Sequence, residues 1–216
     1  MSEKTNPWQI VRDFEAAIAD YAGSRFAVAV DTGTAALFLC CRYLNVGQVT
    51  LPKRTYCSVP CSVIHAGGTV RFEDQQWRGV YRLDPYPIID GACRFTRGMY
   101  EKGTYHCLSF QYRKHLAIGR GGMILTDDAA AVEWFKLARF SGRHEVPLTE
   151  DVPAMIGWSC YMEPERAALG LTLLSITPDR NEDLEFNYPD LSEFNLYEGP
   201  EPEEMRVAAV ETSGVS

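Results

Sequence analysis

Residues 25–44 read RFAVAVDTGTAALFLCCRYL, and this stretch decides the fold. A short apolar run with the character of a buried strand ends at the polar turn Asp31-Thr32-Gly33, and a helical pattern follows. At such a turn the free backbone N–H groups and the dipole of the helix suit a phosphate, and the Thr34 hydroxyl can add a donor. Glycine and threonine also serve as simple helix caps at this place, so this segment alone favours capping.

The alternation of strand and helix continues on both sides of this unit. Apolar periodicity predicts helices over residues 7–21, 58–67, 129–142 and 163–174, and strands over 49–52, 69–74, 87–92, 105–110 and 121–128. Strands and helices in this order predict an α/β fold of three layers with a mostly parallel sheet.

The last part of the chain has a different composition. Residues 179–204 contain ten acidic side chains and one basic side chain, so we expect this segment to be extended, surface-lying or partly disordered. Its aromatic residues could still bind to the domain or to a partner subunit. We therefore divide the chain into a domain over 1–178 and an acidic C-terminal extension over 179–216. The aromatic residues in question are Phe186, Tyr188, Phe194 and Tyr197.

Charge and hydropathy narrow the class of protein. The net charge of −8 across 216 residues provides no positive field for a phosphate backbone, which argues against nucleic-acid binding. No apolar stretch approaches the ~20 residues of a membrane helix, and the N-terminus lacks the apolar segment of a secretory signal. We therefore expect a cytoplasmic protein without a membrane partner. The seven cysteines form an odd set with mostly apolar neighbours, which predicts free thiols and disfavours a structural metal.

Two further segments carry residues suited to chemistry. Asp90 stands at the C-terminal end of a predicted strand, the edge of an open α/β sheet where ligands gather. A carboxylate there needs a hydrogen-donating or positive partner, which a protonated pyridine nitrogen or the cap of the next turn could provide. Lys114 follows five residues after Ser109, before a glycine-rich loop. Taken alone, a lysine in this sequence context is more often a solvated surface charge. A partly desolvated amine near a phosphate anchor, however, can bind a carbonyl compound covalently.

Considered together, these segments resemble the DegT/DnrJ/StrS family of pyridoxal-phosphate-dependent sugar aminotransferases. The resemblance covers about residues 8–175 and rests on the order of four motifs. It implies the large domain of the fold-type I transferases, with the small C-terminal domain reduced or absent. The motifs are the glycine-threonine turn at Gly33, the acid Asp90, the pattern Ser-Phe-x3-Lys that ends at Lys114, and the G-x-G-G strand start at Gly119.

The resemblance also implies a cofactor, pyridoxal 5'-phosphate, and a role for each matched residue. Lys114 matches the lysine that holds the cofactor, and Asp90 matches the acid that pairs with its ring nitrogen. Tyr56 matches the aromatic residue that stacks on the ring, for which ordinary core packing is the alternative. The phosphate cradle of the family is matched by Gly33, Thr34, Ala35 and Ser109.

The sequence also departs from the family pattern. Cys93 stands where the family has His or Gln near the ring hydroxyl, and a thiol would make only a weak hydrogen bond there. Ser159 stands where the family has the Asn that reaches the phosphate of the neighbouring subunit. Family members are also much longer, and the interval 55–90 is short, as though a strand–helix unit were missing.

The resemblance implies an aminotransferase with small-molecule substrates. The expected reaction transfers an amino group, with glutamate as the donor, onto a nucleotide-linked keto sugar in a homodimer with shared active sites. The alternative is a cofactor-binding or regulatory remnant that retains the fold and cannot transaminate because the small domain is missing. A nucleotide-binding α/β protein that uses the loop 119–122 is disfavoured, because that loop leads into a predicted strand and not into a helix.

Overall fold

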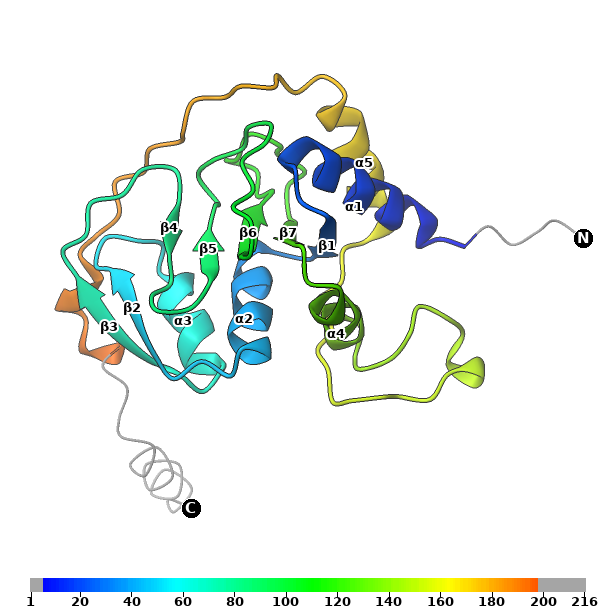
Figure 1. Ribbon diagram of the computed structural model, residues 1–216, viewed down its shortest axis with the longest axis horizontal. Coiled ribbons are helices and arrows are strands. Elements are labelled where there is room, and N and C mark those ends of the chain that lie inside the picture. The colour runs from blue at the N-terminus through cyan, green and yellow to red at the C-terminus, as the bar shows by residue number, and fades with distance from the viewer. Residues whose placement is uncertain (1–5, 198–216) are drawn as a thin grey trace, which may run out of the picture.

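The computed structural model describes residues 6–197 and forms a layered α/β molecule around a five-stranded sheet (Figure 1). The order of strands in this sheet is β1-β7-β6-β5-β4. The bounds of the strands are β1 (Phe26–Val30), β7 (Gly122–Thr126), β6 (Tyr105–Ser109), β5 (Ile88–Asp90) and β4 (Tyr81–Arg82).

Helices cover both faces of the sheet, so the expected three-layer arrangement is confirmed. On one face α2 (Gly33–Tyr43), α3 (Ser58–His65) and α4 (Ala129–Arg139) enclose a core with Val28 and Ile124 of the strands. On the other face α1 (Gln9–Ala22) and α5 (Pro164–Leu174) enclose a second core with Ala29 and Met123. Each strand sends alternate side chains to opposite faces, which is why one sheet has two separate cores.

The directions of the strands differ from the expected mostly parallel sheet. β5 and β6 are parallel, whereas β6 with β7, β7 with β1, and β4 with β5 are antiparallel. Parallel neighbours need a long crossover, usually through a helix. The connections from β4 to β5 and from β6 to β7 are loops without a helix, so the chain returns beside the strand that it has just left.

A small second sheet lies beside the main one. β2 (Gln48–Pro52) and β3 (Thr69–Glu73) are parallel and are joined through α3. A single bridge between Thr50 and Asp84 links β2 to the segment that follows β4. The strands predicted over 49–52 and 69–74 are therefore present, but outside the main sheet.

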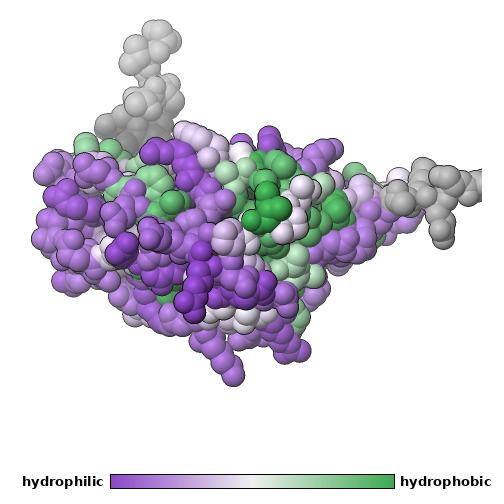
Figure 2. Space-filling view, turned by 90° about the horizontal axis from the view of Figure 1, so that it is seen from above, coloured by the Kyte–Doolittle hydropathy of each residue, from purple (hydrophilic) through white to green (hydrophobic). Residues whose placement is uncertain are grey.

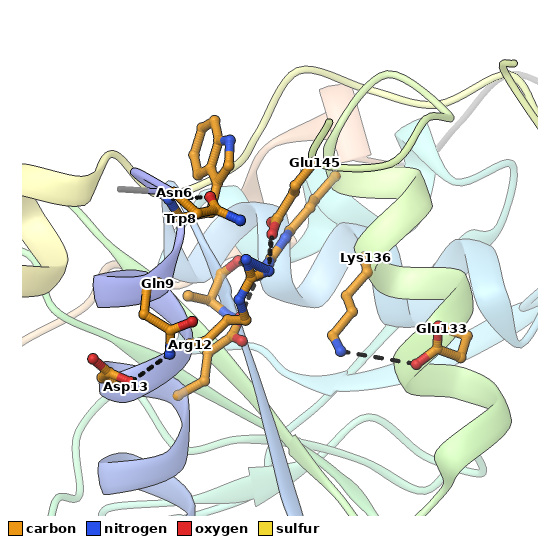
Figure 3. Close-up of polar contacts among 11 residues, drawn as sticks. Asn6, Trp8, Gln9, Arg12, Asp13, Glu133, Lys136 and Glu145 are labelled. Atoms are coloured by element: carbon orange, nitrogen blue, oxygen red, sulfur yellow. Dashed lines mark hydrogen bonds and ion pairs between the residues drawn. The ribbon is translucent and has the colours of Figure 1, made fainter. Parts of the chain in front are cut away.

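Side-chain contacts cap the start of α4 and join its end to the N-terminal helix α1. The Asp128 carboxylate caps α4 by accepting hydrogen bonds from two backbone N–H groups. Arg139 at the end of α4 is 1 % exposed and forms ion pairs with Glu15 of α1 and with Glu145. Arg12 of α1 also contacts Glu145, at 3.3 Å (Figure 3). The loop after α4 is thereby attached to α1.

Residues 179–190, which we call the strap, run from the region after α5 toward β2 and β3 along the upper edge of the molecule in Figure 1. The backbone of the strap is extended and is followed by two short 3-10 helices, η2 (Leu191–Glu193) and η3 (Asn195–Tyr197). The predicted extended character is confirmed for residues 179–190, which contact the body of the molecule. The rest of the proposed acidic extension, residues 198–216, lies outside the described residues.

The face seen from above is mainly hydrophilic near β2 and β3, and hydrophobic residues gather nearer to α1 and α5 (Figure 2). Leu169 of α5 and Ile176, just after that helix, are exposed apolar residues. Within residues 6–197, no helix is both long enough and apolar enough to cross a membrane. Another short helical element of the described part of the chain, η1 (Leu148–Glu150), lies in the loop between α4 and α5.

Candidate active site

A cavity of about 340 Å³ lies where β5 and β6 end and α2 begins. Because β5 and β6 are parallel, Asp90 and Ser109 reach the same edge of the sheet. Gly33 and Thr34 at the start of α2 line the same cavity, as does Lys114 from the loop after β6. Residues from four separate segments thus meet at the edge of the sheet where ligands of α/β proteins bind.

The loop that carries Lys114 is rigidly held. Phe110 and Ile118 are buried in the core beside α1, and the Ile118 N–H donates to the Phe110 carbonyl at 3.1 Å. The Lys114 ammonium nitrogen lies 3.9 Å from the Cys93 sulfur and 4.5 Å from the centre of the Phe186 ring. Lys114 is therefore directed into the cavity, and the structure does not support the alternative that Lys114 is a solvated surface charge.

Asp90 is 7 % exposed, and both of its oxygens accept hydrogen bonds. The Tyr81 hydroxyl donates to Oδ2 at 2.8 Å, and the Ala92 N–H donates to Oδ1 at 2.9 Å. The Tyr81 hydroxyl in turn accepts from Thr55 at 2.5 Å. Burial raises the pKa of Asp90 above its usual value, whereas the two donors and the charge of Lys114 act in the opposite direction.

Small residues and hydroxyl groups form another part of the cavity wall. A Cβ atom on Gly33 would lie 2.9 Å from the Cβ of Ser109, so glycine is required for this close approach. The Thr34 and Ser58 hydroxyls, 2.7 Å apart, both line the cavity and could rotate toward an anion. The Ala35 N–H donates to the Thr32 hydroxyl at 3.0 Å, and Ala35 is not among the residues that line the cavity.

The remaining predicted residues occupy different places. Tyr56 lines the cavity and is 53 % exposed, which rules out the alternative of core packing. Cys93 is buried in the cavity wall, where burial raises the pKa of its thiol. Ser159 lies outside this cavity and forms a β-bridge with Phe140. The structure thus brings together all the predicted site residues except Ala35 and Ser159.

Sequence reasoning missed several aromatic residues of the site. Trp77, Phe186 and Tyr188 line the cavity, and Tyr81 contacts Asp90. The Tyr188 hydroxyl lies 3.9 Å from the Cys93 sulfur, although 95 residues separate the two in the chain. The aromatic content of the acidic extension was the one available signal for Phe186 and Tyr188, and it could not indicate the surface that they contact.

The residues present fit a ligand that combines a carbonyl group, a flat ring and a phosphate. The Lys114 amine suits the carbonyl group, the buried Asp90 suits a cationic ring nitrogen, and the hydroxyl-rich start of α2 suits the phosphate. Tyr56 and Tyr188 supply aromatic surface, with ring centres 6.2 Å apart.

Comparison with known proteins finds relatives that include enzymes of sugar biosynthesis and sugar aminotransferases. The chain is 25% identical to GDP-perosamine synthase of Caulobacter vibrioides, over 77% of this chain and 56% of that protein. It thus spans about half the length of the curated relatives that it matches.

Solved structures confirm the fold. The putative sugar aminotransferase Spr1654 of Streptococcus pneumoniae in its PLP form matches with a TM-score of 0.65 at 18% identity, over 78% of this chain and 59% of that one. DesI, crystallised in the presence of its TDP-sugar product, matches with a TM-score of 0.63 at 23% identity, over 79% of this chain and 54% of that one. The architecture is therefore that of the fold-type I sugar aminotransferases.

The family model covers most of the chain. It matches residues 3–86 and 96–193, and the segment 87–95 with Asp90 and Cys93 lies between the two matched ranges. The second range extends through the strap as far as Glu193. Because the match exceeds half of the chain, this protein belongs to the DegT/DnrJ/EryC1/StrS aminotransferase family.

Proposed function

We propose that this chain binds pyridoxal 5'-phosphate through Lys114 and transfers an amino group to a keto sugar attached to a nucleotide, with glutamate as the donor. The observation that supports the proposal is the meeting of the Lys114 amine, the Asp90 carboxyl and the start of α2 in one cavity. A lysine that binds an aldehyde reversibly needs a partly desolvated amine beside an anchor for the rest of the ligand. The names of the relatives support the sugar as substrate.

In this proposal each residue has a distinct task. The cofactor supplies an electron sink that withdraws charge from the carbon next to the transferred nitrogen. The Lys114 amine would hold the cofactor and would also carry the proton that this carbon loses. Thr34, Ser58 and Ser109 bind the phosphate, and the Tyr56 ring covers the flat face of the ligand.

Asp90 has the task of keeping a proton on the ring nitrogen, which requires the ionised carboxylate. Burial raises the pKa of Asp90 and thus opposes ionisation, whereas the Ala92 N–H and the Tyr81 hydroxyl favour it. A cationic ring nitrogen beside Asp90 would favour the ionised form further. The site therefore needs the Tyr81 donor as well as the acid itself.

The visible absorption spectrum of the chain purified with pyridoxal 5'-phosphate tests the proposal. We expect an absorption band of the lysine-bound cofactor in the wild type and in Lys102→Ala, because Lys102 is exposed and outside the cavity. Lys114→Ala should lose this band. A band that is absent in the wild type, or unchanged in Lys114→Ala, would contradict the proposal.

A second candidate is a remnant that binds the cofactor without transferring amino groups. The observation that favours it is the strap, which brings Phe186 and Tyr188 into the cavity where substrate would enter. An amino-transfer assay with glutamate and several nucleotide keto sugars separates the two candidates, because turnover excludes the remnant. A cofactor band without turnover on any of these sugars would favour it.

We also propose a cytoplasmic homodimer in which each chain contributes to the partner's site. Two observations support it: Ser159 lies outside its own cavity, and the loop between α4 and α5 exposes apolar side chains. The large apolar side chains exposed in that loop are Val146, Leu148, Val152 and Ile156.

A further inference from the structure

The Lys114 amine has a reactive neighbour, the thiol of Cys93. The amine nitrogen lies 3.9 Å from the Cys93 sulfur, and both side chains line the same cavity. The two residues come from different parts of the fold, since Cys93 follows β5 and Lys114 lies in the loop between β6 and β7. A nucleophilic amine and an oxidisable sulfur therefore lie side by side in one cavity.

Backbone contacts hold both residues in place. The Cys93 carbonyl accepts a hydrogen bond from the Leu184 N–H at 2.8 Å, and the Lys114 N–H donates to the Gln111 carbonyl at 2.8 Å. The lysine side chain has a flexible stem of four carbons, so its amine can close the remaining gap to the sulfur while the backbone stays fixed. The two atoms are thus placed for a bond that needs side-chain movement only.

The surroundings of Cys93 leave Lys114 as the nucleophile next to its sulfur. Among the hydrogen bonds of the described part of the chain, this sulfur has two partners, the Lys114 amine and the Tyr188 hydroxyl, each at 3.9 Å. Burial raises the pKa of Tyr188, so its hydroxyl stays protonated and is a poor nucleophile. Cys107 also lines the cavity, but its sulfur lies 3.6 Å from that of Cys40, which gives it a partner of its own.

A small oxidant can enter the cavity from solvent. Tyr56 and Tyr112 line the cavity and are 53 % and 69 % exposed, so it is open to the outside. Cys93 itself is 3 % exposed, and burial raises the pKa of its thiol, whereas the charge of Lys114 lowers it. The thiolate is the form that reacts with oxidants, and here it is a minor species. Oxidation of Cys93 should therefore be slow and should require sustained exposure to an oxidant.

We propose that Cys93 and Lys114 form a reversible redox modification site, in which a hydroperoxide joins the two side chains through a sulfur–nitrogen bond. The Cys93 thiolate attacks the peroxide: a sulfur–oxygen bond forms, the oxygen–oxygen bond breaks, and the sulfur is oxidised to a sulfenic acid. The Lys114 ammonium gives a proton to the alkoxide or hydroxide that leaves. The neutral amine then attacks the sulfur, and the sulfenic hydroxyl leaves as water with one proton of the amine.

This modification takes the Lys114 amine out of use. A nitrogen that is bonded to sulfur is no longer the free amine that condenses with a carbonyl compound. Two thiols of a reductant restore both side chains, because they reduce the sulfur–nitrogen bond to amine and thiol and are themselves joined as a disulfide. The inference goes beyond the proposed function, since the cross-link forms in the chain without any cofactor.

Peptide mapping by mass spectrometry tests the inference. The full chain is treated with hydrogen peroxide and digested with trypsin in the absence of reductant. Treatment should produce a species that joins peptide 83–94, which contains Cys93, to peptide 114–120, which begins with Lys114. Its mass should be lower than the sum of the two peptides by two hydrogen atoms. Addition of a thiol reductant should release both peptides.

Cys107→Ser is the matched control, because Cys107 also lines the cavity and is 2 % exposed. This variant should form the cross-link like the wild type. Lys114→Arg retains the positive charge beside Cys93, but its guanidinium stays protonated and is a poor nucleophile. The cross-link should be lost in Lys114→Arg, and the sulfenic acid of Cys93 should instead react with dimedone, a reagent for sulfenic acids.

The outcomes separate this inference from the proposed function. A treated wild-type chain whose Cys93 stays reduced or becomes a sulfinic acid, without joined peptides, would overturn the inference even where the cofactor band is present. Loss of the cross-link in Cys107→Ser would also overturn it. If the proposed function holds as well, prior saturation with pyridoxal 5'-phosphate should abolish the cross-link, because the Lys114 amine is then occupied. A cross-link in a chain that never shows the cofactor band would support the inference and contradict the proposed function.

Discussion

At the scale of single residues, the contact between Tyr81 and Asp90 has the sharpest consequence. Tyr81 is 4 % exposed and donates to Asp90 Oδ2, which stabilises the ionised carboxylate. Tyr81→Phe removes this donor, so the pKa of Asp90 should rise further. As the pH falls, the variant should lose the cofactor at a pH about one unit higher than the wild type does. A hydrogen bond to a charged group contributes about 1.5 kcal/mol, which corresponds to about one pKa unit.

The Tyr81 prediction is measured by following the absorption band of the bound cofactor against pH. Tyr105→Phe is the control, because Tyr105 is also buried and its hydroxyl donates at 2.8 Å to another carboxylate, that of Asp128, which caps α4. This control should lose some stability to unfolding without a shift in the pH profile. Identical profiles in Tyr81→Phe and the wild type would show that Tyr81 does not act on Asp90.

At the scale of elements, the strap depends on pairs that join distant parts of the chain. Arg94 contacts Asp183 at 2.6 Å across 89 residues, and a Cβ on Gly79 would lie 2.4 Å from the Asp183 carboxyl carbon. Asp183 therefore packs closely on the turn at 75–79. Arg94 lowers the pKa of Asp183, so the pair stabilises the strap at neutral pH and is lost only as the pH falls below the ordinary carboxyl range.

Asp183→Asn should release the strap over the cavity. The Leu184 N–H, which donates to the Cys93 carbonyl at 2.8 Å, should exchange its hydrogen about tenfold faster, because a partly buried ion pair contributes on the order of 1.4 kcal/mol. Hydrogen–deuterium exchange with mass spectrometry measures this rate. Glu101→Gln breaks the more exposed pair with Arg82 and should leave the strap unchanged. Equal protection in all three proteins would mean that Asp183 does not hold the strap.

The elements also show which parts of the fold could be predicted from sequence. Apolar periodicity located α1, α2, α4 and α5 to within a few residues, because their buried faces repeat every three or four positions. β4 was missed since it has two residues and is defined by its pairing with β5, a contact without a local pattern.

The site also has a part that could be predicted from the sequence and a part that could not. Lys114, Asp90 and Thr34 lie in the motifs that carry the family resemblance, so their meeting in one cavity was expected from that resemblance. The path of the strap could not, because it depends on ion pairs such as that between Lys53 and Asp190, and composition does not indicate such partners.

At the scale of the whole molecule, the exposed loop between α4 and α5 bears on assembly. Ile156 is 92 % exposed and Val152 is 80 % exposed, and apolar side chains that gather on a surface often mark an interface. Arg139 and Arg12 hold the start of this loop through ion pairs with Glu145. If the loop forms the homodimer interface, Ile156→Asp should place a charge in it and convert the dimer to a monomer.

Light scattering coupled to size-exclusion chromatography measures this change. Ile176→Asp is the matched control, because Ile176 is 77 % exposed just after the end of α5, outside the loop. The control should remain a dimer, whereas Ile156→Asp should dissociate at least tenfold more readily, as expected when a charge is buried without a partner. If Ser159 reaches the partner's cofactor site, the monomeric variant should also bind pyridoxal 5'-phosphate more weakly. A wild-type chain that is monomeric at all concentrations would contradict the shared site, and Lys114 would then have to hold the cofactor within a single chain.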